Sequence, residues 1–168
     1  FESGRRATAL KAVTTTEEQL ADHYSGFPVM PASLIVEGFA QVGGLLVGEA
    51  SDYHERVVLA KVNKSTFHFE VRPGDVLRYE VTIDDIRPDG AIARGTSYVG
   101  DRLQAEVRLM FAQLDDRFEG VDLFYPDELL NVLRLLGVFD IGRKADGSPI
   151  TVPQHLLDAE ALANQSEL

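Results

Sequence analysis

Residues 31–49, PASLIVEGFAQVGGLLVGE, decide which fold the sequence predicts. Pro31 suits the entrance of a helix, because its missing N–H costs nothing there. The residues after it are apolar on nearly every side of the predicted helix, whereas a surface helix would carry one apolar stripe. We therefore expect a helix enclosed by other structure. Gly38, Gly43 and Gly44 lower its helix propensity, so we predict that close packing against a sheet requires all three.

Strand-like segments lie on both sides of this helix. One precedes it at residues 6–13, and the others follow at residues 57–62, 66–71, 76–86, 91–99 and 103–114. Turn sequences such as Arg87-Pro88-Asp89-Gly90 separate the later segments. This order predicts an α+β fold, in which one long central helix is wrapped by a curved antiparallel sheet.

The C-terminal part of the chain has a different pattern. Pro126 and Asp127 open a leucine-rich helix with Gly137 as its C-cap, and a second helix is predicted near residues 154–163. About 50 residues without a disulfide or a metal bury little surface by themselves. We therefore predict a main domain of residues 1–115 and a C-terminal helical extension, residues 116–168, packed on it.

Composition excludes several classes of function. The 168 residues carry 16 basic and 27 acidic side chains, a formal net charge of −11, which disfavours binding to nucleic acid or to an anionic membrane. No apolar run reaches the roughly 20 residues of a membrane-spanning helix. The chain has no cysteine, which excludes disulfides and thiolate metal sites and suits a cytoplasmic location, the one we expect.

Two ionisable residues flank the start of the central helix. His23 lies in a Gly/Pro loop before it, and Glu37 lies among apolar residues in its first turns, where burial is costly without a partner or a role. The free N–H groups at the helix N-terminus can polarise a carbonyl. These are the parts needed to remove a proton α to a thioester carbonyl and expel a β-hydroxyl group.

Other chemistries have weaker support. His54, His68 and His155 are expected to be structural or solvated, and no metal-ligand spacing occurs, so we expect no metal and no cofactor. Ser25 and Ser33 lie near His23, but the Gly-x-Ser-x-Gly sequence of a nucleophile elbow is absent.

Residues 23–41, HYSGFPVMPASLIVEGFAQ, resemble the signature of the (3R)-hydroxyacyl-[acyl-carrier-protein] dehydratases of fatty-acid synthesis. That family has a histidine, an aromatic residue, Pro-Val-Met-Pro and then Leu-Ile-x-Glu-x-x-Ala-Gln. A second block agrees in order and spacing: KVNKSTF at residues 61–67, followed by RPGD at residues 72–75. The sequence departs from the family at Ser25, which is usually proline, and at Ala32, which is usually glycine.

The resemblance implies a hot-dog fold, the general dehydratase branch and a catalytic pair of His23 and Glu37. It implies a homodimer, with a higher oligomer also open, in which histidine and acid come from different subunits. It also implies an apolar acyl tunnel beside the central helix and a substrate carried by acyl carrier protein or coenzyme A. Candidate substrate-binding residues are Gly26, Phe27, Pro28, Val29, Met30, Ala32, Ser33, Gln41 and Phe67.

Two alternatives stay open at this point. The chain could be a hot-dog acyl thioesterase, which would activate water for hydrolysis. It could also be a non-catalytic acyl-binding homologue, an idea supported by the departures at Ser25 and Ala32. Docking of an acidic carrier would need a local basic patch on an acidic protein, and its candidate residues are Arg72, Arg78, Arg102 and Arg108, with Arg5 and Arg6 in reserve.

Overall fold

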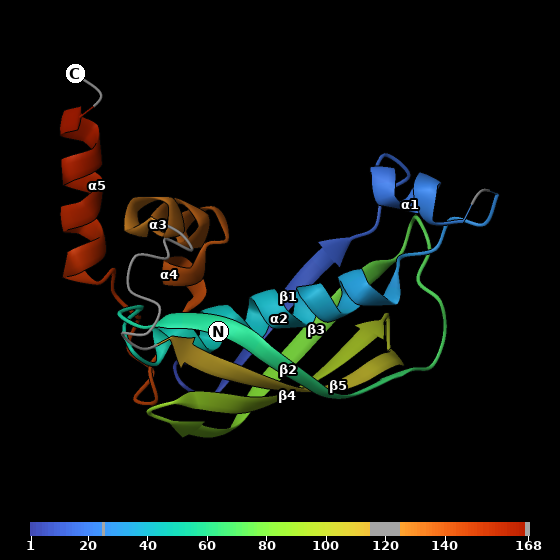
Figure 1. Ribbon diagram of the computed structural model, residues 1–168, viewed down its shortest axis with the longest axis horizontal. Coiled ribbons are helices and arrows are strands. Elements are labelled where there is room, and N and C mark those ends of the chain that lie inside the picture. The colour runs from blue at the N-terminus through green and yellow to red at the C-terminus, as the bar shows by residue number, and fades with distance from the viewer. Residues whose placement is uncertain (25, 115–124, 167–168) are drawn as a thin grey trace.

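The computed structural model describes residues 1–24, 26–114 and 125–166 (Figure 1). Its elements are, in chain order, β1 (Arg6–Ala12), α1 (Glu18–His23), α2 (Ala32–Glu49), β2 (Arg56–Phe67), β3 (Val76–Arg87), β4 (Gly90–Val99), β5 (Arg102–Leu114), α3 (Pro126–Leu135), α4 (Val138–Ile141) and α5 (Gln154–Ser166). The strands form one antiparallel sheet with the order β1-β3-β4-β5-β2. The α+β architecture with one long central helix is therefore confirmed, and it is that of a hot-dog fold.

Strand β2 corrects the sequence prediction. Residues 57–62 and 66–71 were expected as two strands, whereas a single strand runs from Arg56 to Phe67 along β5. Its register shifts between Leu59 and Lys61 and again between Val62 and Lys64. After each shift the next side chains of β2 point to the opposite face of the sheet. The strand therefore lacks the regular alternation of polar and apolar residues that predicts a strand from sequence.

Helix α2 approaches the sheet closely at two of its glycines. A Cβ atom on Gly38 would lie 2.5 Å from Cζ of Tyr79, and one on Gly43 would lie 2.6 Å from Cζ of Phe111. A Cβ on Gly44 would meet only Cε1 of Phe111, at 3.9 Å, which is an ordinary contact. The prediction that packing requires these glycines is therefore confirmed for Gly38 and Gly43 and wrong for Gly44.

The sheet covers only one side of α2. Phe39, Leu46 and Val47 are fully buried against it, whereas Glu37 and Gln41 are exposed. By length and composition alone α2 could cross a membrane, but 44% of it is buried inside the protein, and core helices pass the same test. The expectation of a helix enclosed on all sides is thus wrong for the single chain.

The C-terminal helices have a small core of their own. Leu130 and Leu133 of α3 are fully buried in a cluster that includes Tyr53, from the segment after α2. The backbone around Arg143 joins the N-terminal segment: its N–H donates to the carbonyl of Phe1 (2.9 Å), and its carbonyl accepts from the N–H of Ser3 (2.8 Å). Residues 126–166 therefore contact the main sheet domain. The predicted boundary at residues 115 and 116 lies outside the described residues.

Helices α3 and α5 were predicted from the sequence, whereas α4 was not. Gly137 follows α3 with a φ of 66°, the left-handed conformation expected of a glycine C-cap. In Figure 1 the C-terminal helices stand beyond one end of α2, and α1 stands beyond the other. The exposed side of α2 therefore lies between two raised parts of the molecule.

Candidate active site

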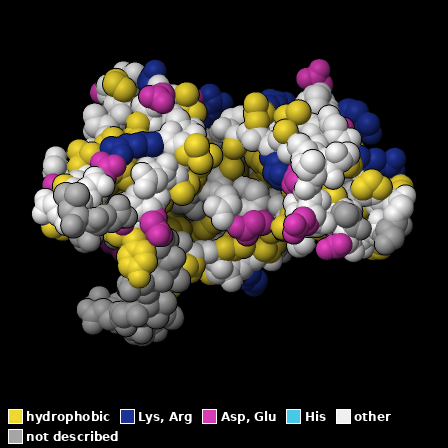
Figure 2. All heavy atoms as spheres, turned by 90° about the horizontal axis from the view of Figure 1, so that it is seen from above, with side chains coloured by type: hydrophobic (Ala, Val, Ile, Leu, Met, Phe, Trp, Pro, Cys, Tyr) yellow, Lys and Arg dark blue, Asp and Glu magenta, His cyan; other side chains and the backbone are white. Residues whose placement is uncertain are grey.

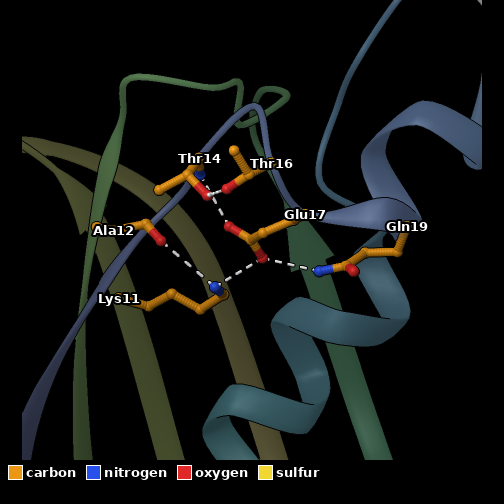
Figure 3. Close-up of polar contacts among 6 residues, drawn as sticks. All are labelled: Lys11, Ala12, Thr14, Thr16, Glu17 and Gln19. Atoms are coloured by element: carbon orange, nitrogen blue, oxygen red, sulfur yellow. Dashed lines mark hydrogen bonds and ion pairs between the residues drawn. The ribbon is translucent and has the colours of Figure 1, made fainter.

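Helix α1 holds His23, and a polar cluster around Glu17 fastens this helix to β1 (Figure 3). The Glu17 carboxylate accepts hydrogen bonds from Nζ of Lys11 (2.8 Å), the N–H of Thr14 (2.8 Å) and Nε2 of Gln19 (2.7 Å). The hydrogen bonds from Lys11 and Thr14 are the main reasons that the pKa of Glu17 lies below its ordinary value. This cluster positions the start of α1, and His23 is the last residue of that helix.

His23 faces a hollow of about 310 Å³ at the N-terminal end of α2. Its ring packs against that of Tyr24, with 4.3 Å between ring centroids, and its side chain is exposed. The sequence predicted a loop from His23 onward, whereas His23 is the last residue of α1. The hollow is lined by His23, Val29, Met30, Ala32, Ile35, Phe67, His68, Phe69, Glu70 and Gln104.

The first turn of α2 opens into the same hollow through Ala32. By their position, the N–H groups of Ala32 and Ser33 have no acceptor within the helix. The N-cap residue is Pro31, which has no side-chain cap, and the first turn carries no acidic residue. The partial positive charge of this helix end is therefore available to a carbonyl oxygen of a ligand. His23 and this helix end meet at one place, which suits a reaction at the carbon next to a carbonyl.

A buried amide supports the far wall of the hollow. Gln104 is fully buried; its Oε1 accepts from Oγ of Ser97 (2.7 Å), and its Nε2 donates to the carbonyl of Phe69 (2.9 Å). Both ends of the amide are satisfied, so Phe69 is held against the end of the sheet. Gln104 was not predicted as a site residue, because a glutamine within a strand pattern gives no local signal of burial.

Glu37 lies in a different depression, a groove of about 490 Å³ between α2, β2 and α3. Its carboxylate is exposed and accepts a hydrogen bond from Nε2 of Gln41 (2.6 Å), one turn further along the helix. The expectation of a buried Glu37 is therefore wrong for the single chain, because the sheet covers the opposite side of α2. The groove lining includes Gly44, Leu45 and Leu129, none of which was predicted from the sequence as a site residue.

The remaining predicted site residues divide into two groups. Val29 and Met30, both buried, and Phe67 line the hollow with His23. Gly26, Phe27, Pro28 and Ser33 line neither the hollow nor the groove; Phe27 instead lies beneath the guanidinium of Arg72, 4.6 Å from the ring centroid. The departure from the family at Ser25 lies outside the described residues.

The other histidines have ring or ion-pair partners of their own. The rings of His54 and His155 stack with 4.0 Å between centroids, and Nε2 of His68 lies 3.2 Å from Oε2 of Glu106. Over the described ranges, no group of three or more His, Cys, Asp or Glu residues is placed to hold a metal ion. The hollow therefore offers the imidazole of His23 beside a helix N-terminus, whereas His68, which also lines it, lies next to Glu106.

Comparisons with known proteins agree with this geometry. A family model described as a FabA-like domain matches residues 1–108. The chain is 41% identical over 112 residues to the 3-hydroxyacyl-[acyl-carrier-protein] dehydratase FabZ of Pelotomaculum thermopropionicum, covering 66% of this chain and 80% of that protein. It is 39% identical over 113 residues to FabZ of Desulforamulus reducens, covering 67% and 80%.

A solved structure adds evidence on the fold. The structure of a thioesterase from Haemophilus influenzae aligns with a TM-score of 0.55 and 15% identity, covering 66% of this chain and 73% of that one. At this identity the likeness concerns the fold alone. The match over residues 1–108 and the identities to the two FabZ proteins settle the kinship: this chain belongs to the FabA-like family, among the 3-hydroxyacyl-[acyl-carrier-protein] dehydratases.

Proposed function

We propose that this protein dehydrates (3R)-hydroxyacyl thioesters to trans-2-enoyl thioesters in fatty-acid or related acyl-chain synthesis. The observation that carries the proposal is the meeting of His23 with the N-terminus of α2 in one hollow. It occurs in a chain whose relatives bear the name 3-hydroxyacyl-[acyl-carrier-protein] dehydratase.

The reaction follows from the chemistry of these groups. The N–H groups at the start of α2 polarise the thioester carbonyl, which acidifies the hydrogens on C2. His23 takes one C2 proton, the C2–H electron pair forms the new double bond to C3, and the C3–O bond breaks. Glu37 hydrogen-bonds the 3-hydroxyl, which leaves as water after accepting a proton from Glu37 or from the His23 that has just gained one. The sum is the loss of one water molecule, with no cofactor.

We also propose that each active site is shared between two copies of the chain. Within one chain His23 and Glu37 face different depressions, so a site that uses both needs Glu37 from elsewhere. The edge strand β2, exposed from Leu59 to Ser65, and the exposed start of α2 around Glu37 offer surfaces for a second copy. An edge strand leaves backbone N–H and C=O groups unpaired, and association with a second copy can cover them. A two-fold dimer is the commonest form of such association.

The substrate carrier is proposed to be acyl carrier protein. Arg102 lies over Phe69, a lining residue of the hollow that holds His23, at 4.2 Å from the ring centroid. Arg72 follows Val71, whose carbonyl accepts from the N–H of Met30 (2.8 Å), another lining residue. Arg78 is a weaker candidate, since its guanidinium donates to Glu80 (2.6 Å). Replacing Arg72 and Arg102 with Glu should raise KM for a carrier-bound substrate and spare a short thioester mimic. Equal effects on both substrates would overturn this part of the proposal.

A cytoplasmic location is proposed with the function, because a chain without cysteine forms no disulfides and does not need an oxidising compartment to fold. Fractionation of the source cells tests it, and recovery with membranes or in a secreted fraction would contradict it.

The test of the function supplies 3-hydroxyacyl and plain acyl thioesters side by side and follows the products by mass spectrometry. We expect loss of water from the first and no hydrolysis of the second. His23→Ala and Glu37→Gln should each lower kcat/KM by about 100-fold or more, the usual contribution of a general acid or base. His54→Ala, a control outside the hollow, should leave the rate unchanged. Hydrolysis of plain acyl thioesters would make the protein a thioesterase, and binding without turnover would make it an acyl-binding homologue.

A further inference from the structure

The groove that contains Glu37 extends along α2 to the C-terminal extension. One wall is the exposed side of α2, from Glu37 to Gly48, and the strand side is formed by Val57, Val58 and Leu59 of β2. Figure 2, which views the molecule from above, shows hydrophobic side chains in the hollow between its two raised ends. The groove has a volume of about 490 Å³, within the usual range of small-molecule sites.

Gly44 keeps the middle of this groove open. The other close glycines of α2 are required by packing, but a side chain on Gly44 would meet no obstacle closer than 3.9 Å. A glycine within a helix costs about 1 kcal/mol relative to alanine, and the contacts of α2 with the sheet give no reason for that cost here. Because Gly44 lines the groove, the absence of a side chain there keeps the groove open.

Helix α3 forms the far end of the groove. Leu129 and Val132 of α3 line it together with Tyr53, whose N–H donates to the carbonyl of Gly48 (2.7 Å). Two contacts hold this wall: Leu130 is fully buried, and Nη1 and Nη2 of Arg134 donate to the carboxylate of Glu160 in α5. Helix α3 begins at Pro126, beyond the family match to residues 1–108. The extension therefore supplies an end wall that the matched domain does not contain.

The chemistry of the lining indicates which class of ligand can bind in the groove. Among the residues that the structure describes, its charged members are Glu37, Glu55 and Glu128, and none is Lys or Arg. A phosphate or carboxylate ligand would meet only negative charge there. A neutral hydrocarbon chain would meet Leu45, Val57 and Leu129 instead.

Resting on the proposed function, we propose that the C-terminal extension sets the longest acyl chain this enzyme accepts, with Leu129 and Val132 as the stop. Glu37 marks the position of C3. Eleven residues of helix separate Glu37 from Gly48, a length of about 16 Å at 1.5 Å per residue. Carbon–carbon bonds of about 1.5 Å advance a staggered chain by about 1.3 Å each, so about 12 carbons fit beyond C3. The substrates are therefore 3-hydroxyacyl thioesters of short to medium length, up to about 15 carbons.

The experiment measures kcat/KM of the full chain for 3-hydroxyacyl thioesters of four, twelve and eighteen carbons. The wild type should accept the first two and be at least about tenfold slower with the third, since a badly fitting methylene group costs at least that factor. Leu129→Trp and Val132→Trp should lower the rate for twelve carbons about tenfold or more and leave that for four carbons within about twofold. Combining Leu129→Ala with Val132→Ala should raise the rate for eighteen carbons relative to twelve. Leu135→Trp is the matched control, because Leu135 belongs to the same helix, is 86% exposed and does not line the groove.

The outcomes separate this inference from the proposed function. A wild type that dehydrates all three lengths equally, with no shift in the tryptophan variants, overturns the length limit and leaves the dehydratase intact. A wild type that dehydrates none of them, including four carbons, means that the proposed function has failed. Tryptophan variants that change the oligomeric state at an unchanged length profile would assign the groove to a second copy of the chain and overturn the inference. If the tryptophan variants fail to fold, the alanine pair still decides, because it shifts the limit in the opposite direction.

Discussion

Two neighbouring glycines of α2 should respond in opposite directions to the same substitution. In Gly43→Ala the new Cβ would lie 2.6 Å from Cζ and 2.9 Å from Cε2 of Phe111, a residue that is 2% exposed, so the ring would have to shift within the core. Overpacking of this kind costs about 1–3 kcal/mol, and the better helix propensity of alanine offsets about 1 kcal/mol of it. In Gly44→Ala the Cβ makes an ordinary contact at 3.9 Å, so the helix gains about 0.5–1 kcal/mol without a clash.

The two variants should therefore differ by about 2 kcal/mol in the free energy of unfolding, with Gly44→Ala the more stable. For a chain of this size that is a difference of about 4–8 °C in Tm. Thermal and denaturant unfolding followed by circular dichroism measure both quantities, and the wild type lies between the variants. Equal stability of the two variants, or a less stable Gly44→Ala, would refute the packing of α2 on the sheet described above.

Three further changes test other parts of the structure. Glu17→Gln should lower Tm at neutral pH, because the folded state lowers the pKa of Glu17 and its charge therefore stabilises the fold above the ordinary pKa. This stabilisation is lost as the pH falls through the folded-state pKa, so the difference in Tm from wild type should shrink in acid. A difference that stays constant with pH would contradict the role of the charge. Tyr79→Phe removes a buried hydroxyl that has no hydrogen-bond partner among the described residues; burial raises the pKa of this hydroxyl to about 12. We expect denaturant unfolding to show unchanged or slightly higher stability. A loss above about 1 kcal/mol would mean that the hydroxyl has a partner. Gln104→Leu leaves the Ser97 hydroxyl and the Phe69 carbonyl without the partner that the amide provides, so we expect a loss of about 2–4 kcal/mol in the free energy of unfolding. Unchanged stability would show that the amide does not support the hollow.

Much of the architecture could be predicted because local sequence determined it. The apolar helix after Pro31, the succession of strands before and after it along the chain, and the glycine cap at Gly137 all follow from local patterns. Strand β2 was divided wrongly, because its register shifts depend on the pairing with β5 and leave no local pattern.

The site was predictable in its parts and not in their arrangement. The residues around His23 were named from the sequence, and Val29, Met30, Ala32 and Phe67 do share its hollow. Nothing in the sequence showed that Glu37 would be exposed, since that depends on which side of α2 the sheet covers. The contact of α3 with the groove of Glu37 joins residues about 90 positions apart, a distance over which periodicity gives no information.

Catalysis by His23 of one subunit with Glu37 of another is tested most directly by mixing two inactive variants, His23→Ala and Glu37→Gln, under conditions that exchange subunits. A mixed dimer then contains one site with both changes and one with neither. At equal mixing about half of the dimers are mixed, so dehydration activity should recover to roughly a quarter of wild type. If each site were built within one chain, every site would carry a change. No recovery of activity despite demonstrated subunit exchange would contradict the shared site.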